Sequence, residues 1–185
     1  MVEILPIKLL GEDDGPIFGS LNVTLGKLAR ANLPVGKSFC ITAPELHLKT
    51  ILETYDFGSK EVFEQSLTLI KKDIENTSVP SELYNELGKY KSFFLRDQQV
   101  NYVQRLWLVL LNFWLEQVQL RLWKDGFSPG VTENLEPIVV TVVEKSKAFG
   151  EAFFENEQDG VMVNIKAGKL APKDLQKLDE IVRTA

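Results

Sequence analysis

The chain has 185 residues and a formal net charge of −5, with 44% hydrophobic and 25% charged residues, which is ordinary globular usage. This length suffices for one well-buried domain and is short for two, so we expect a single domain over residues 1–185. The acidic balance argues against binding to nucleic acid or to an anionic membrane, because both are recognised through an excess of basic residues. Cys40 is the only cysteine, which excludes an intramolecular disulfide and a cysteine-rich metal site and favours a cytoplasmic location.

No segment has the pattern of a targeting signal or a membrane span. Glu3 and Pro6 stand where a signal peptide has a basic start and an unbroken apolar core. The longest apolar run, 106–115, is far shorter than the ~18 residues that a spanning helix needs. We therefore expect a buried core helix there.

The first half of the chain alternates between strands and helices. Thr42, followed by Glu45 three residues later, is typical of a capping box and predicts that a helix begins there. Apolar spacing predicts strands over 2–7 and 38–41 and helices over 21–32, 62–74 and 81–89.

The second half begins with a long helix, predicted over 99–124. Its middle is apolar on nearly every side, with Trp107 and Trp114 among the leucines, so we expect the rest of the domain to pack around it. The β-branched run 138–143 predicts a central strand buried on both faces. Further predictions are strands over 148–154 and 161–165, a turn at Asp159-Gly160 between them, and an amphipathic helix over 172–182. The predicted class is α+β, with a small mixed or antiparallel sheet packed against several helices.

The stretch 19–42, GSLNVTLGKLARANLPVGKSFCIT, carries a known motif. It resembles the opening of the ATP-binding domain shared by phosphoenolpyruvate synthase and pyruvate phosphate dikinase, whose pattern is roughly GGKGANLxxLxxxGLPVPPGFVIT. The residues that agree without gaps are Gly19, Leu25, Leu28, Leu33, Pro34, Val35, Phe39, Ile41 and Thr42, and Gly26 falls on an unspecified position of the pattern. The resemblance implies a shortened, partial ATP-grasp-type nucleotide-binding fold.

Later segments follow the same family in the same order. The run SFFLRD, 92–97, is similar to a family strand that ends in an arginine, which places Arg96 at a position that contacts nucleotide phosphates. The run 138–143 is similar to a VVVQxM strand, and 149–154 to an SGVxFT strand that keeps its glycine as Gly150. A segment after residue 97 is missing, and the family's metal-binding acids and phosphocarrier histidine have no counterpart in this sequence.

The residues that handle phosphate in the family motif are replaced. Ser20 and Asn22 stand at glycine positions, and Leu21 stands at the position of the nucleotide-contacting lysine. A lysine ammonium makes charge-assisted hydrogen bonds to phosphate oxygens, which leucine cannot make. The resemblance therefore implies nucleotide contacts only at Arg96, Gly19 and Ser20, no catalytic residue, and ATP with magnesium as the only ligand to consider.

Three other features do not indicate a functional site by themselves. His47, the only histidine, has no Cys or His partner at i+3 or i+4, so a packing or surface role is expected. The cluster Glu12-Asp13-Asp14 predicts a solvated turn in preference to a magnesium site. Cys40, between Phe39 and Ile41 on a predicted strand, is expected to be a buried, inert thiol.

Three functions stay open. The first is a non-catalytic module, derived from the dikinase ATP-binding domain, that acts in interaction or regulation. The second is residual binding of nucleotide or a small phosphate ligand around Arg96, and the third is an enzyme half-site completed in trans by another chain. A homodimer or a protein partner is expected, because an apolar wall formed by 138–143 and 149–154 would otherwise need the final helix as its cover.

Overall fold

The computed structural model describes residues 2–31, 36–55, 59–96, 98–125, 129–143, 150–154 and 161–165, and for the last two ranges the backbone alone. The chain divides into two compact units, Met1–Val142 (unit 1) and Val143–Ala185 (unit 2). Each unit is described by itself. One domain over the whole chain therefore stays a prediction.

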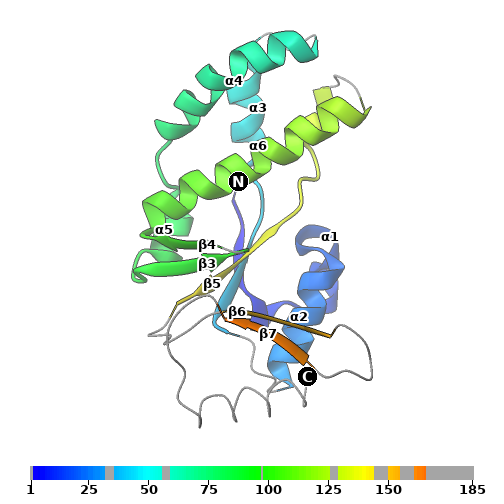
Figure 1. Ribbon diagram of the computed structural model, residues 1–185, viewed down its shortest axis with the longest axis vertical. Coiled ribbons are helices and arrows are strands. Elements are labelled where there is room, and N and C mark those ends of the chain that lie inside the picture. The colour runs from blue at the N-terminus through cyan, green and yellow to red at the C-terminus, as the bar shows by residue number, and fades with distance from the viewer. Residues whose placement is uncertain are drawn as a thin grey trace. The chain divides into compact units, whose positions relative to one another are not determined.

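A five-stranded antiparallel sheet forms the framework of unit 1 (Figure 1). In spatial order its strands are β1 (Ile4–Pro6), β2 (Ser38–Ile41), β5 (Ile138–Val142), β3 (Ser92–Leu95) and β4 (Gln98–Asn101). Every neighbouring pair is antiparallel. β5 is the middle strand, as its β-branched run predicts, and the α+β class is confirmed.

Helices cover the two faces of this sheet (Figure 1). One group consists of α3 (Glu45–Glu53), α4 (Lys60–Glu75), α5 (Ser81–Leu87) and α6 (Val103–Asp125). The other consists of α1 (Gly15–Phe18) and α2 (Ser20–Arg30) with the 3-10 turns η1 (Ile7–Leu9) and η2 (Glu12–Asp14). A further 3-10 turn, η3 (Pro129–Thr132), follows α6.

The alternation of side chains along each strand divides the core into two clusters. On β2, Phe39 and Ile41 belong to the large cluster that includes α6, whereas Cys40 belongs to a small cluster with Phe18 and Val23. Val139 of β5 also packs against this small cluster. The middle of the sheet is thus covered on both faces within unit 1.

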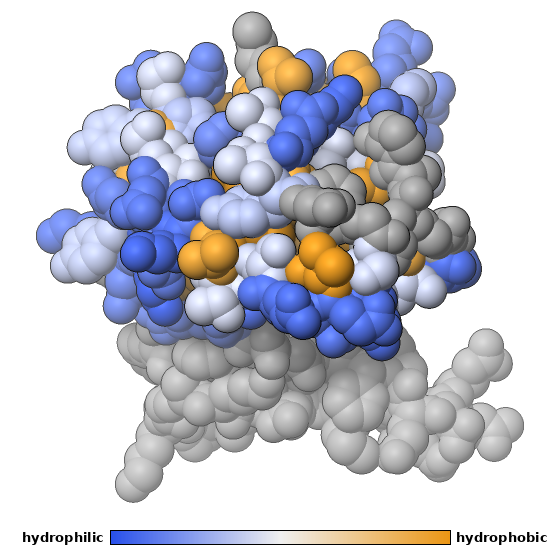
Figure 2. Space-filling model, turned by 90° about the horizontal axis from the view of Figure 1, so that it is seen from above, coloured by the Kyte–Doolittle hydropathy of each residue, from blue (hydrophilic) through white to orange (hydrophobic). Residues whose placement is uncertain are grey.

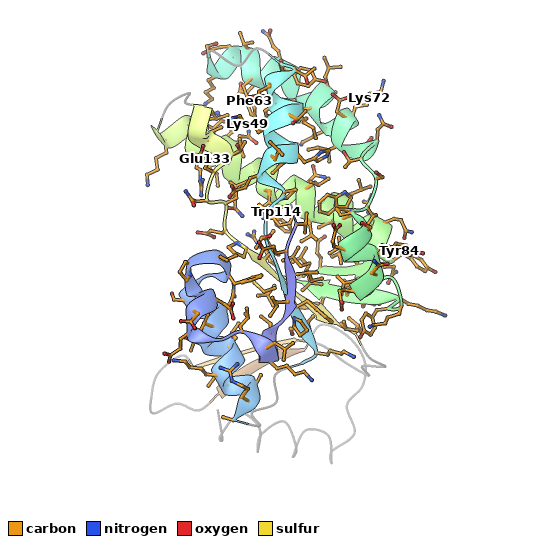
Figure 3. The ribbon with its side chains drawn as sticks, turned by 180° about the vertical axis from the view of Figure 1, so that it is seen from behind. Lys49, Phe63, Lys72, Tyr84, Trp114 and Glu133 are labelled. Atoms are coloured by element: carbon orange, nitrogen blue, oxygen red, sulfur yellow. The ribbon has the colours of Figure 1, made fainter. Side chains whose placement is uncertain are left out.

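The long helix α6 is enclosed along its middle. Trp107 and Trp114 are only 1% and 0% exposed, and their rings meet edge to face with centroids 6.2 Å apart. Figure 3 shows Trp114 near the middle of unit 1 and Tyr84 at its periphery. Toward the C-terminal end, Leu120 and Trp123 are 62% and 43% exposed, so the enclosure predicted for α6 holds for its middle turns alone.

Two predicted helix starts were wrong. The long helix begins at Val103 and not at residue 99, because 98–101 form β4 and pair with β3. The helix predicted from Thr42 begins at Glu45, and Pro44 at its N-cap makes no side-chain cap. The Thr42 hydroxyl instead accepts a hydrogen bond from the Glu3 backbone N–H at 2.8 Å, which ties β2 to the segment before β1.

Unit 2 contains a two-stranded antiparallel ribbon of β6 (Gly150–Phe154) and β7 (Val161–Ile165), close to the strands predicted there. The predicted turn at 159–160 and the predicted helix at 172–182 lie outside the described residues.

Candidate functional site

The opening of the dikinase-like motif forms the junction between α1 and α2. Gly19 has φ 82° and ψ 143°, a conformation that residues with a Cβ rarely adopt, and α2 begins at Ser20. The Gly19 carbonyl accepts the first hydrogen bond of α2, from Val23 N at 3.2 Å. The backbone N–H groups of residues 20–22 therefore lie at the positive end of the helix, where an anion is best placed.

The side chains at this helix start do not complement an anion. Ser20 is exposed, and Leu21, at the position of the family lysine, is 72% exposed and apolar. The Asn22 amide donates to the Phe18 carbonyl at 2.7 Å and to Cys40 Sγ at 3.3 Å. Asn22 is thus used to join α2 to α1 and β2.

Gly26, which lies in the same stretch at an unspecified position of the pattern, is a packing residue. A Cβ at this position would lie 2.6 Å from the Ile7 carbonyl oxygen and 3.1 Å from that of Leu10. Only glycine permits α2 to lie this close to the segment around η1. The motif position is therefore explained without a ligand.

Gly19 lines a cleft of about 500 Å³ whose charged residues are acidic. The lining consists of Glu3, Pro16, Ile17, Gly19, Thr42, Ala43, Glu45, Leu46, Asn134, Leu135, Glu136 and Pro137. Among the described residues, this lining has three carboxyl side chains and no lysine or arginine. Such a cleft repels polyphosphate, since like charges close together are unfavourable.

The part of the lining formed by residues 134–137 is held in place by α6. Trp114 Nε1 donates to the Glu136 carbonyl at 3.0 Å, and the Gln117 amide oxygen accepts from Glu136 N at 2.9 Å. The Arg121 guanidinium donates to the carbonyls of Glu133 and Asn134. These bonds fix the segment 133–137 without using any ligand.

Arg96 does not line the cleft of Gly19. It has φ 51°, is exposed, and stacks its guanidinium 4.2 Å from the ring centroid of Phe113. Phe113 lines a second cleft of about 270 Å³, together with Gln98 and Arg105, and Arg96 is not part of that lining either. No cleft of the described residues therefore brings together Gly19 and Arg96, the candidates expected to contact one nucleotide.

The remaining candidates have structural roles. Glu12 forms an ion pair with Lys27 at 2.9 Å, which lowers the pKa of Glu12, and the Asp14 carboxylate accepts from Gly11 N at 2.6 Å. Across the described residues, no group of three Asp, Glu, His or Cys side chains could hold a metal ion. His47 is exposed on α3 and its Nε2 lies 3.4 Å from the Thr77 hydroxyl.

A third cleft, of about 800 Å³, was not foreseen from the sequence. Its residues include His47, Asp73 and Trp107, which come from three helices far apart in the chain. No spacing rule along the sequence links them, because tertiary packing alone brings them together.

Comparison with known proteins supports the resemblance for part of the chain. A probable phosphoenolpyruvate synthase of Staphylothermus marinus is 30% identical over 90 residues, which cover 43% of this chain and 11% of that protein. The chain thus spans about a tenth of the length of the relative that it matches. No family model matches the chain, and no solved structure is similar to it. A region of this chain is therefore similar to part of a phosphoenolpyruvate synthase. Among the described helices, none is long and apolar enough to cross a bilayer.

Proposed function

We propose that this chain is a non-catalytic module, derived from the ATP-binding region of a phosphoenolpyruvate synthase-like enzyme, that acts by contacting another protein chain. The observation that carries the proposal is Leu21, which replaces the family lysine in the first turn of α2 and leaves 72% of its surface in water. Phosphoryl transfer depends on cations that position and neutralise the phosphates. The described lining of the Gly19 cleft supplies three carboxyl groups and not the cations that such a transfer requires.

The same helix offers a surface for association. Leu21 and Leu28 are seven residues apart on α2, on one side of the helix, and are 72% and 39% exposed. Ile17 on α1, which precedes them, is 51% exposed. We call Ile17, Leu21 and Leu28 the α2 stripe. An apolar stripe at a position where the family has lysine fits a protein partner better than a phosphate, and a second copy of the chain is the simplest partner.

The nucleotide question has a direct test. We expect calorimetric titration with ATP and magnesium to show no binding tighter than roughly 1 mM, about −4 kcal/mol, because neither a lysine nor flexible glycines meet the phosphates. The Arg96→Ala variant, titrated in parallel, should behave identically. A micromolar dissociation constant that Arg96→Ala leaves unchanged would contradict the proposal and leave the site unassigned.

A second candidate function is binding of a small phosphate ligand beside Arg96. The observation in its favour is that Phe113, on which Arg96 stacks, lines a cleft shared with Arg105. The Arg105 guanidinium is suited to a phosphate, although Glu75 and Glu116 line the same cleft and Arg96 contacts it only through Phe113. Micromolar ATP binding that disappears in Arg96→Ala would select this function.

A further inference from the structure

Strand β4 forms one edge of the sheet, and among the described residues no strand pairs with its outer side. The Tyr102 backbone N–H donates to the Lys91 carbonyl at 2.9 Å, in register with the pairing of β3 and β4. Bonded and non-bonded pairs alternate along an antiparallel ladder, so every second residue of β4 directs its backbone groups toward β3. The N–H and C=O groups of Gln99 and Asn101 therefore point away from the sheet. We call these four groups the β4 edge.

The opposite edge of the sheet, β1, is blocked. The Thr42 N–H donates to the Glu3 carbonyl at 3.0 Å, so by the same alternation the outward backbone groups of β1 belong to Ile4 and Pro6. Proline has no N–H, and natural sheets commonly protect their edges with proline or charged residues. The sequence of β4, Gln-Gln-Val-Asn, contains neither. Of the two edges, β4 is thus the one that can accept a further strand.

A cleft adjoins β4 on the face of the sheet that α6 covers. Its volume is about 270 Å³, and we call it the α6 cleft. Among the described residues of the sheet, Gln98 alone lines it, and β4 contacts α6 directly (Figure 1). Gln98 and Val100 project to the same face, and Val100 is buried in the large cluster that includes α6. The full lining is Glu75, Gln98, Arg105, Leu108, Val109, Asn112, Phe113 and Glu116.

A strand added to the β4 edge would direct alternate side chains toward this cleft. Side chains opposite Gln98 and Val100 on the added strand lie on the same face as those residues, with Cβ atoms about 5 Å apart. A side chain opposite Gln98 therefore reaches the α6 cleft. The half-buried apolar residues of the lining are Leu108, Val109 and Phe113. Sheets bind extended peptides by this combination, in which the backbone bonds give affinity and the pocket selects a side chain.

The charges around the α6 cleft favour an uncharged side chain. Glu75 and Glu116 line the cleft together with Arg105. The Arg96 guanidinium stacks on Phe113 of the same lining. Two carboxylates and two guanidinium groups leave no excess of either sign, so an aliphatic side chain is accommodated more readily than an ion.

The other face of β3 and β4 is polar at this edge. Gln99 Nε2 donates to Ser92 Oγ at 2.7 Å, and Ser92 Oγ donates to Asn101 Oδ1 at 3.0 Å. These bonds hold the side chains of Gln99 and Asn101 on the face away from the α6 cleft. An added strand therefore matches the site when its side chains alternate, polar on this face and aliphatic toward α6.

We propose that the β4 edge binds an extended segment of a partner protein, which adds to the sheet as a further antiparallel strand and places an aliphatic side chain in the α6 cleft. The antiparallel direction follows the sheet, in which every neighbouring pair is antiparallel. The segment has no proline where it bonds to the β4 edge. This site is separate from the α2 stripe and does not depend on the homodimer.

A designed peptide tests the site on the full chain. The probe has about seven residues, is blocked at both ends, and alternates threonine with leucine. ¹H–¹⁵N spectra report binding at the assigned backbone amides of Gln99 and Asn101. We expect both signals to shift saturably with a dissociation constant below about 1 mM, and both amides to exchange their hydrogen more slowly in the complex.

Methylation of the peptide nitrogens tests the strand geometry without altering the protein. In the antiparallel register the threonines lie opposite Gln99 and Asn101, and their N–H groups donate to the β4 edge. A peptide of N-methylthreonine should therefore bind at least about tenfold more weakly. A peptide of N-methylleucine, whose methylated nitrogens face away from β4, should bind within about threefold of the parent peptide. Equal effects of the two methylations would overturn the proposal.

Gln99→Pro is the decisive variant, because it removes a donor of the β4 edge and no backbone bond of the sheet. It should weaken peptide binding at least about tenfold, whereas Gln99→Ala, the matched control that keeps the N–H, should bind as the wild type does. Leu21→Lys should also bind normally, which separates this site from the proposed dimer. A wild-type protein whose Gln99 and Asn101 amides do not respond to the peptide would overturn the proposal. Protection of these amides in the free protein would do the same, since the edge would already be occupied.

Discussion

The thiol of Cys40 lies in the small cluster between β2 and α2, fully buried, with the Asn22 amide 3.3 Å from its sulfur. Burial raises the pKa of this thiol from 9.0 to about 12, because an apolar site disfavours the thiolate. The expectation of a buried thiol at Cys40 is thus confirmed. The folded protein therefore favours the protonated thiol of Cys40. The stability that the small cluster contributes is fully present below about pH 9 and is lost as the pH rises toward 12.

This environment predicts slow labelling of Cys40. At pH 8 the native protein should react with a thiol reagent such as DTNB at least roughly a hundredfold more slowly than the chain unfolded in urea, since the thiolate is the reactive form. The single cysteine makes the readout unambiguous. Equal rates for native and unfolded protein would show that the small cluster opens readily, or that the sulfur is accessible.

The motif residues show what one sequence can and cannot reveal at this scale. That Leu21 cannot bind phosphate follows from its chemistry alone. The close packing of Gly26 against the Ile7 carbonyl could not be predicted from the sequence. The two residues are 19 positions apart and meet only in the folded chain. The Asn22 bonds to Phe18 and Cys40 could not be predicted either, since an asparagine in the first turn of a helix has many partners within reach.

Among the elements, α6 contributes most to the core of unit 1. We expect Trp107→Ala and Trp114→Ala each to lower the free energy of unfolding by roughly 3–5 kcal/mol. Trp114→Ala should cost more of the two, because it also removes the 3.0 Å hydrogen bond to the Glu136 carbonyl and leaves that oxygen only the longer bond from the Gln117 amide at 3.5 Å. Urea denaturation measures both changes.

Trp123 on the same helix is the matched control. It is 43% exposed and lies under Lys60, whose Nζ is 4.8 Å from the ring centroid, so Trp123→Ala should cost less than about 1.5 kcal/mol. Losses below about 1 kcal/mol for Trp107→Ala and Trp114→Ala would mean that α6 is not enclosed.

Most strands and helices followed from periodicity, and the exceptions have local causes. β2 and β7 have the predicted bounds because each is a short apolar run next to a glycine or a polar segment. The β3–β4 hairpin was missed because Arg96 and Tyr102, which flank β4, adopt positive φ without being glycine or asparagine. The capping box at Thr42 was wrong because the hydroxyl pairs with a segment 39 residues away.

At the scale of the whole molecule, the proposed partner surface is the α2 stripe. The apolar wall expected at 138–143 is covered on both faces by the two clusters of unit 1, so it no longer supplies the reason for association. On the face shown in Figure 2, apolar side chains form small separate patches among hydrophilic ones. Leu21 is 72% exposed, the largest value among the exposed large hydrophobic side chains described.

We therefore expect the protein to form a dimer at micromolar concentration and Leu21→Lys to shift it toward the monomer. A lysine in the stripe would bring two like charges together across a twofold contact. Multi-angle light scattering measures the mass of each form, with Leu120→Lys on α6 as the control that changes another exposed leucine, 62% exposed, outside the stripe. A wild-type protein that stays monomeric at high concentration would contradict the homodimer.

Sheet order and clefts were beyond prediction for a common reason. The sheet has the strand order β1-β2-β5-β3-β4, so strands that are far apart in the sequence lie next to each other. Each pairing depends on which helix covers which face. Arg96 and Gly19 were linked through the resemblance alone, and Arg96 is absent from the lining of the cleft that Gly19 lines. The residues that line the cleft of about 800 Å³, such as His47 and Trp107, share no regular spacing in the sequence, so they could not be grouped before the fold was known.

The close packing of Gly26 against the Ile7 carbonyl affects how sequence patterns in this stretch should be interpreted. A β-carbon there would meet a carbonyl oxygen at 2.6 Å, so the packing of α2 against η1 requires a glycine at position 26 whether or not a phosphate binds nearby. Gly19 is favoured for a similar reason, its φ of 82°. A sequence pattern that relies on glycines can therefore match this stretch through backbone packing alone. The side chain at position 21, which is leucine here, reports on phosphate binding more directly.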